Sequence, residues 1–159
     1  MQELRVADVH RLHDMAAVSM NQDTPFRDVI ARLALNPALR GVFLVDSKLV
    51  YTGMMRPMDL MKWARLRLRG AKGRDMSLKE ILHIDEAQKA SDLLHFNRRY
   101  SVHEEDSLQT ALDIMLDYEE DVIPVVDSQG RVVGDLTLAE VLLHTLRLER
   151  QSDNASGNR

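Results

Sequence analysis

A β-hairpin pattern that occurs twice constrains the fold of this chain more than any other feature. Its second copy begins with the apolar, largely β-branched run 123–126, which is typical of a buried strand. Residues 127–130 (Asp-Ser-Gln-Gly) supply the turn, and a second strand is expected to end at Val133. The first copy, 42–53, aligns with it without a gap, pairing Val45, Asp46, Ser47 and Gly53 with Val126, Asp127, Ser128 and Gly134. The spacing of 81 residues is longer than a solenoid repeat and indicates one small domain that has been duplicated.

A helix start follows each hairpin. After the second one, Gly134 permits a sharp exit or a close backbone approach, and Thr137 is a good N-cap. Glu140 stands three residues further on, so Thr137 and Glu140 have the spacing of a capping box. After the first hairpin, Pro57 occupies a favoured first helical position. We therefore expect one helix to begin at Pro57 and another to begin directly after Thr137.

An amphipathic helix also precedes each hairpin. Apolar residues recur at helical spacing in Phe26–Leu35 and in Ser107–Tyr118, while charged residues lie off the stripe. The order of helices and short strands predicts a mixed α/β chain built from two halves. We place a first domain at 1–70, a linker at 71–76 and a second domain at 77–150, and we expect residues 151–159 to be a disordered tail.

Composition argues against several classes of function. The net charge of -4 is unlike the strongly basic balance of a dedicated nucleic-acid binder. The absence of cysteine removes disulfides, thiolate nucleophiles and thiolate-bound zinc. His10 and His13 have helical spacing, but no HExxH pattern accompanies them, so we expect no metal site. No nucleophile is paired with a base, so we expect no enzymatic activity.

No apolar run approaches the length of a membrane span, and the N-terminus lacks an apolar signal core. We therefore expect a cytoplasmic protein that does not cross a membrane. Two half-size domains also leave apolar helix strips that a symmetric partner can cover, so we expect a homodimer.

The duplicated unit of helix, apolar strand with Val-Asp-Ser, tight turn, short strand, glycine and helix start resembles the cystathionine β-synthase (CBS) domain. The resemblance extends from about Val6 to Arg150 as a tandem pair. It implies two repeated βαββα units packed with pseudo-twofold symmetry. It also implies a regulatory module that binds AMP, ATP or S-adenosylmethionine as a regulatory ligand, with no obligatory cofactor.

The resemblance further implies where such a ligand would bind. In the family, a Thr or Ser hydroxyl at the helix start meets phosphate, and an Asp three residues later holds both ribose hydroxyls. In the first half, Asp59 has the place of the ribose carboxylate and Arg56 has that of the hydroxyl. In the second half, Thr137 keeps the hydroxyl and Glu140 replaces the Asp. The implied adenine walls are Ser19, Met20, Val42 and Phe43 in the first half, and His103, Ile123 and Pro124 in the second.

These residues also have simpler structural interpretations. Asp59 is a first-turn acid that favours the helix dipole, and Thr137 with Glu140 forms an ordinary capping box. Arg56 can bind phosphate or fill the cleft. The basic cluster at 65–74 is most simply a solvated helix end. Two functions therefore stay open: an adenine-nucleotide-sensing module that acts on an unknown partner protein, and a ligand-free scaffold that only dimerises or docks.

Overall fold

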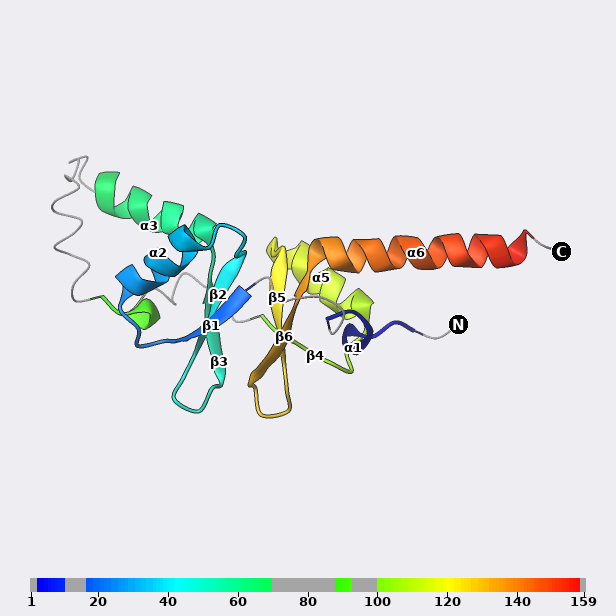
Figure 1. Cartoon of the computed structure of the whole chain (residues 1–159), viewed down its shortest axis with the longest axis horizontal. Helices are drawn as coiled ribbons and strands as arrows, with labels where there is room; N and C mark the ends of the chain where they lie inside the picture. The colour runs from blue at the N-terminus through cyan, green and yellow to red at the C-terminus, as the bar shows by residue number, and fades with distance from the viewer. Residues whose placement is uncertain (1–2, 11–16, 70–87, 93–99, 158–159) are drawn as a thin grey trace. The chain divides into compact units, whose positions relative to one another are not determined.

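The chain forms two compact units, as the computed structural model in Figure 1 shows. The structure describes residues 3–10, 17–69, 88–92 and 100–157, with side chains omitted for 66–69. The first unit is Ala16–Arg99, and the second unit combines Met1–Met15 with Tyr100–Arg159. The expected linker at 71–76 lies outside the described residues.

The first unit contains a three-stranded sheet in the order β1-β2-β3. Its elements are β1 (Ala17–Asn21), α2 (Phe26–Leu35), β2 (Gly41–Val45), β3 (Tyr51–Met55) and α3 (Pro57–Arg69). Strand β1 runs parallel to β2, and β2 runs antiparallel to β3. The strand, helix, two strands and helix follow one another in the βαββα order that the resemblance implied.

The second unit repeats this arrangement with the sheet order β4-β5-β6. Its elements are α1 (Val6–His10), β4 (Val102–His103), α5 (Leu108–Tyr118), β5 (Val122–Val126), β6 (Val132–Thr137) and α6 (Leu138–Ser156). Strand β4 is parallel to β5, and β5 is antiparallel to β6.

The register of the two hairpins confirms the duplication that the sequence predicted. Val42 pairs with Met55 in the first unit, and Ile123 pairs with Leu136 in the second, so both partners are shifted by 81 residues. Each hairpin also has a register irregularity at the same place, near the end of β2 and near the end of β5. The same backbone has therefore been kept in both copies.

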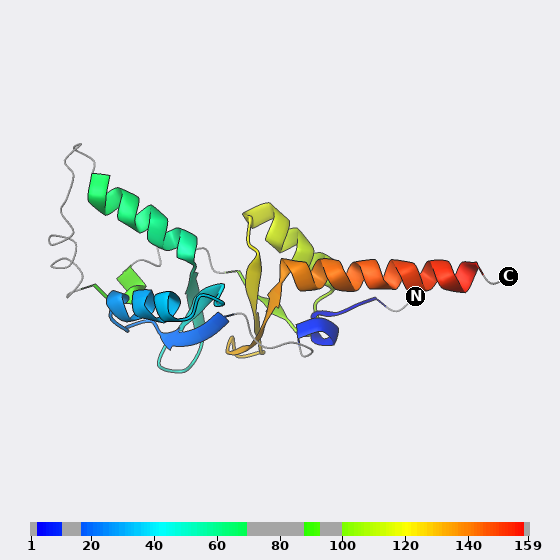
Figure 2. The same ribbon diagram turned by 45° about the horizontal axis from the view of Figure 1, so that its top comes forward.

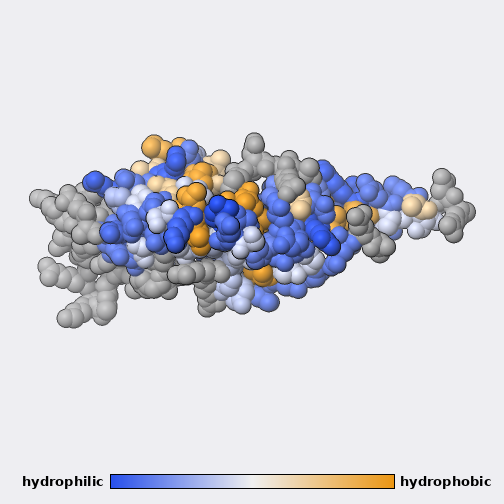
Figure 3. Space-filling view, turned by 90° about the horizontal axis from the view of Figure 1, so that it is seen from below, coloured by the Kyte–Doolittle hydropathy of each residue, from blue (hydrophilic) through white to orange (hydrophobic). Residues whose placement is uncertain are grey.

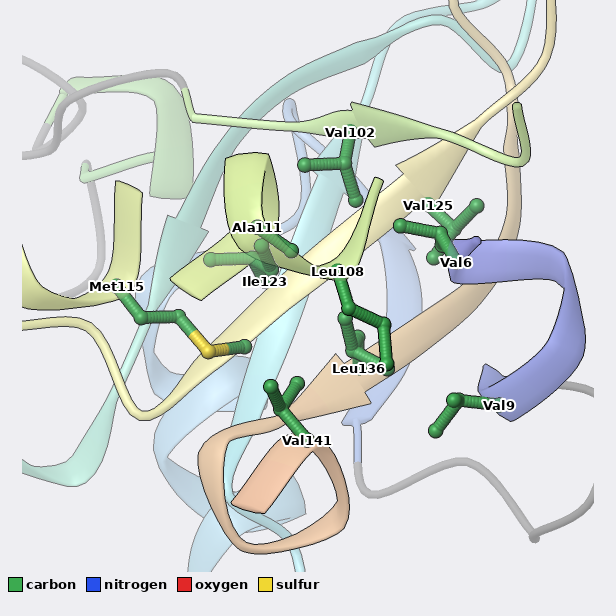
Figure 4. Packing of buried hydrophobic residues seen from close by; sticks show 10 residues of the cluster. All are labelled: Val6, Val9, Val102, Leu108, Ala111, Met115, Ile123, Val125, Leu136 and Val141. Carbon is green, nitrogen blue, oxygen red and sulfur yellow. The ribbon is translucent and has the colours of Figure 1, made fainter. Parts of the chain in front are cut away.

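The boundary of the units differs from the predicted division at 1–70 and 77–150, because the N-terminal helix α1 packs on the second unit. The backbone N–H of Val6 donates to the Asp106 carbonyl at 2.9 Å, and that of Ala7 donates to Glu104 at 2.9 Å. Figure 4 shows the side chains of Val6 and Val9 among those of the second core, where both are fully buried. The contiguous division is therefore corrected: the apolar face of α1 is covered by strands that lie about a hundred residues further along the chain.

The segment 88–92 is held within the first unit by backbone hydrogen bonds to residues near the start of α2. The backbone N–H of Phe26 donates to the Gln88 carbonyl at 2.9 Å, and the N–H of Ala90 donates to the Thr24 carbonyl at 2.8 Å. Ala90 is fully buried with the first core.

The core members with the highest burial are Phe26, Val29, Leu33, Val42, Leu44 and Met55 in the first unit. In the second unit they are Val6, Val9, Val102, Leu108, Ala111, Met115, Ile123, Val125, Leu136 and Val141.

The last helix is longer than predicted, since α6 continues to Ser156 through a segment expected to be disordered. No glycine or proline interrupts it before Gly157, and the hydroxyls of Ser152 and Ser156 donate to carbonyls of the preceding turn. Figure 2 shows this helix extending well beyond the sheet of its own unit. Its far end is mainly hydrophilic in Figure 3. Among the described residues, no helix has the length and hydropathy that a bilayer crossing requires.

Candidate functional site

The start of α3 holds the two residues expected to bind phosphate and ribose in the first unit. Strand β3 ends at Met55, and Arg56 connects it to the helix, which begins at Pro57. The backbone N–H of Arg56 donates to Asp59 Oδ2 at 2.8 Å, and Arg56 Nε lies 3.6 Å from the same oxygen. Asp59 therefore satisfies a backbone donor at the N-terminus of its own helix.

The second oxygen of Asp59 is not used in this way. The side chain of Asp59 is only 6% exposed, and its Oδ1 is buried and accepts no hydrogen bond from the described residues. The Nζ of Lys62 lies 3.9 Å away, which is too far for a hydrogen bond. A buried carboxylate oxygen without a donor is costly, and a ligand hydroxyl would remove that cost. The carboxylate at the implied ribose position therefore has an acceptor available.

The equivalent helix start in the second unit is closed by its own side chains. The backbone N–H of Glu140 donates to Thr137 Oγ1 at 3.3 Å, and the N–H of Thr137 donates to Glu140 Oε2 at 3.0 Å. These two bonds confirm the predicted capping box. The hydroxyl and one carboxylate oxygen of the implied second site are thus engaged within the helix.

The charges around the two helix starts differ. Arg40 stands directly before β2, which pairs with β3. Its equivalent, Asp121, stands directly before β5, and its carbonyl accepts the N–H of Leu138 at 2.9 Å. The first start thus has the cations Arg56 and Lys62 beside Asp59, whereas the equivalent positions of the second start are Thr137 and Leu143. A cation nearby adds to the attraction of a helix N-terminus for anions.

The implied adenine walls are divided between the two faces of each sheet. In the first unit, Val42 and Met20 pack with the hydrophobic core. Ser19 and Phe43 are paired across β1 and β2, and they lie on the opposite face. Phe43 also makes an edge-to-face contact with Tyr51 at 6.0 Å. Val42 can therefore offer only its backbone to a ligand on that face, and Ser19 and Phe43 stay as predicted wall residues.

The second unit divides its wall residues in the same way. Ile123 belongs to the core, whereas Pro124 is paired with Asp135 on the other face. His103 is exposed at the end of β4. Asp135 is a buried carboxylate that the sequence interpretation missed, and its only signal was one acid inside an otherwise apolar strand.

A second buried polar group that was missed is His10. Its Nε2 lies 3.0 Å from Glu104 Oε1, and the ring packs against the backbone of Gly134. A Cβ added at Gly134 would lie 2.4 Å from His10 Nδ1, so the predicted close approach at this glycine is confirmed. His13 lies outside the described residues. Within the described part of the chain, no three His, Cys, Asp or Glu side chains are placed to hold a metal ion.

The basic cluster at 65–74 can be followed only as far as Arg65, whose side chain is exposed; the side chains beyond it are not described.

Residues 74–146 match the family model of the CBS domain. A CBS domain-containing protein from Thermotoga maritima has 26% identity and a TM-score of 0.72, covering 92% of this chain and 97% of its own. The chain contains a CBS domain. The family match covers β4, α5, β5, β6 and the first part of α6, and the hairpin of the first unit has the same register 81 residues earlier. No curated protein sequence matches the chain.

Other CBS proteins have the same fold at lower identity. CBSX2 in complex with AMP has 18% identity and a TM-score of 0.65, covering 92% of this chain and 98% of its own. The cytosolic domain of the Mg²⁺ channel MgtE in complex with ATP has 19% identity and a TM-score of 0.60, covering 89% of this chain and 48% of its own. This CBS pair therefore has the fold of proteins whose structures contain adenine nucleotides.

Proposed function

We propose that this CBS pair is a regulatory module, without a reaction of its own, that binds a phosphorylated adenosine in its first unit and modulates a partner protein. The observation that carries the proposal is Asp59, which stands at the implied ribose position with one buried oxygen that accepts no hydrogen bond from the described part of the chain. A ribose diol can donate to both carboxylate oxygens, so it would satisfy Oδ1 directly. Similar folds with AMP or ATP support an adenine ligand.

Arg56 extends the proposal from adenosine to its phosphates. Its side chain is 19% exposed, and its guanidinium lies beside Asp59 at the N-terminus of α3. A helix N-terminus and a forked cation both favour phosphate. We therefore expect ADP to bind more tightly than adenosine, and we expect Arg56→Ala to narrow that difference.

A calorimetric titration of the full chain with adenosine, AMP, ADP, ATP, NAD and S-adenosylmethionine tests the proposal. Thermal unfolding provides a second readout, because a ligand at 100 times its Kd stabilises the folded state by about 2.7 kcal/mol. Binding of at least one phosphorylated adenosine is expected. If no member of the panel binds or raises the Tm, the nucleotide proposal is wrong.

The competing function is a ligand-free scaffold, and the exposed apolar side chains of α6 favour it. Leu142, Leu143 and Leu146 lie exposed on this helix.

Apolar strips of this kind commonly mark contact surfaces, so we also propose that the CBS pair forms a homodimer. Light scattering at about tens of micromolar, a range suited to interfaces of ordinary size, should give twice the chain mass. A monomer at that concentration would contradict the dimer.

A further inference from the structure

Among the described residues, Lys62 is the charged side chain that lies against the buried oxygen of Asp59 and that the proposed function does not yet use. We propose that Lys62 determines ligand specificity by exchanging counterions. It neutralises Asp59 before a ligand binds, and it neutralises a ligand phosphate after ribose has taken the carboxylate. This inference rests on the proposed nucleotide site in the first unit.

The geometry of Lys62 suits such an exchange. It stands on α3 one turn after Asp59, with Nζ 3.9 Å from Oδ1. The side chain is 56% exposed, whereas that of Asp59 is 6% exposed, so the ammonium approaches the carboxylate from the solvent side. At this distance the pair has an electrostatic attraction but no hydrogen bond. A donor hydroxyl that takes Oδ1 therefore competes with this attraction but breaks no hydrogen bond to Lys62.

The charge balance gives the displaced ammonium a second partner. Around Asp59 the positive charges of Arg56 and Lys62 exceed the single negative charge of the carboxylate. A phosphate bound near the helix start would bring negative charge to the same region, within reach of a long and mobile lysine side chain. Adenosine brings no such charge, so for adenosine Lys62 is only a competitor at Oδ1.

The second unit has no lysine at the position equivalent to Lys62. The residue equivalent to Lys62 is Leu143, which is apolar and exposed. The residue equivalent to Asp59 is Glu140, one oxygen of which is engaged with the Thr137 backbone. The counterion exchange is therefore specific to the first unit rather than a general feature of the repeated fold.

The proposal predicts effects of opposite sign from one substitution. Lys62→Met removes the competitor at Asp59, so adenosine should bind more tightly. The same variant removes a cation from the phosphate region, so ADP should bind more weakly. Each change should be about two- to fivefold, the range of partly exposed charge pairs, and should shrink at high salt.

Lys48→Met is the matched control. Lys48 is an exposed lysine of the same unit, and it lies in the turn between β2 and β3, at the end of the hairpin remote from α3. The Lys48→Met substitution removes the same charge as Lys62→Met at a position that does not contact Asp59. Calorimetry of the original chain, Lys62→Met, Lys48→Met and Asp59→Ala with adenosine and with ADP, at low and high salt, completes the test.

Opposite shifts for the two ligands in Lys62→Met, absent from Lys48→Met, would establish the exchange. Shifts of the same sign, or shifts equal to those of Lys48→Met, would overturn it. If the exchange is overturned but Asp59→Ala loses ADP binding, the proposed nucleotide site is still supported. If the original chain binds no phosphorylated adenosine, the proposed nucleotide site and the exchange are both wrong.

Discussion

The starts of α3 and α6 are the same backbone feature used in two ways. In the second unit, Thr137 and Glu140 satisfy each other's backbone donors and complete a capping box. In the first unit, Arg56 has no hydroxyl to offer. Asp59 satisfies one donor, and its other oxygen is buried without a hydrogen bond from the residues that the structure describes. A functional site often keeps a polar group unsatisfied that a purely structural site would satisfy. The contrast is the one expected if the second unit favours stability at this position and the proposed nucleotide site lies in the first.

The close contact of Gly134 with His10 should give the largest effect on stability, and it tests whether α1 belongs to the second unit. Gly134→Ala would place a Cβ 2.4 Å from His10 Nδ1, and His10 is held by Glu104. We expect a loss of about 1–3 kcal/mol, as for other overpacked sites. Urea unfolding followed by circular dichroism measures it. The loss should be smaller when His10→Ala is already present, and an equal loss in both backgrounds would contradict the contact.

Removal of the hydroxyl cap sharpens the comparison of the two helix starts. Thr137→Ala should lower the free energy of unfolding by about 1 kcal/mol, because the N–H of Glu140 loses its acceptor. Thr137→Ser retains the hydroxyl and should lose much less. Neither variant should alter ADP binding, since the proposed nucleotide site lies in the first unit. A weaker affinity for ADP in Thr137→Ala would assign the phosphate to the second unit instead.

The hairpin turns differ at one equivalent position, where Leu49 has φ 66° and Gly130 has φ 78°. A left-handed conformation is strained for leucine and ordinary for glycine. Leu49→Gly should therefore stabilise the first unit by roughly 0.5 kcal/mol, after the greater entropy of glycine in the unfolded chain is subtracted. Gly130→Leu is the reverse exchange and should destabilise the second unit. A destabilising Leu49→Gly would show that its side chain has a use that the turn geometry does not reveal.

Asp127 gives the smallest expected effect, with a defined pH dependence. Backbone hydrogen bonding from Arg131 is the main cause that lowers the pKa of Asp127, with further help from Gln129 and the Arg131 side chain. Because the folded pKa is below the unfolded one, the stabilisation is present above about pH 4 and is lost as the pH falls through the folded pKa. Asp127→Asn should therefore be less stable than the original chain at pH 7, and the urea midpoints should converge below about pH 4. A constant difference across this range would contradict the assignment.

Local chemistry made the hairpins and the capping box predictable from sequence. The turn residues after Val126, Gly134 and the Thr137–Glu140 spacing each specify a short-range geometry, and the structure has all of them. The place of α1 was not predictable in this way, because Val6 and Val9 show only that one helix face needs a cover, not which strands supply it. Asp135 and His10 were missed for the same reason, since the tertiary surroundings make them buried.

The candidate site was only partly predictable. The resemblance to the family gave Asp59 the place of the ribose carboxylate and Arg56 the place of the phosphate-binding hydroxyl. Whether each carboxylate oxygen of Asp59 accepts a hydrogen bond depends on how the start of the helix is capped. Oδ2 is used and Oδ1 is not, a distinction that no sequence pattern contains. The wall residues are divided between faces by the register of β1 with β2, which the sequence did not specify.

Calorimetry of ADP binding to Asp59→Ala and to Glu140→Ala tests most directly whether the first unit is the nucleotide site. Asp59→Ala should weaken binding by about 1.5–3 kcal/mol, as expected for hydrogen bonds lost from a charged group, while Glu140→Ala should leave the affinity unchanged. Thermal unfolding of both variants confirms that each is folded. Unchanged binding in Asp59→Ala together with loss of binding in Glu140→Ala would place the nucleotide in the second unit and contradict the account.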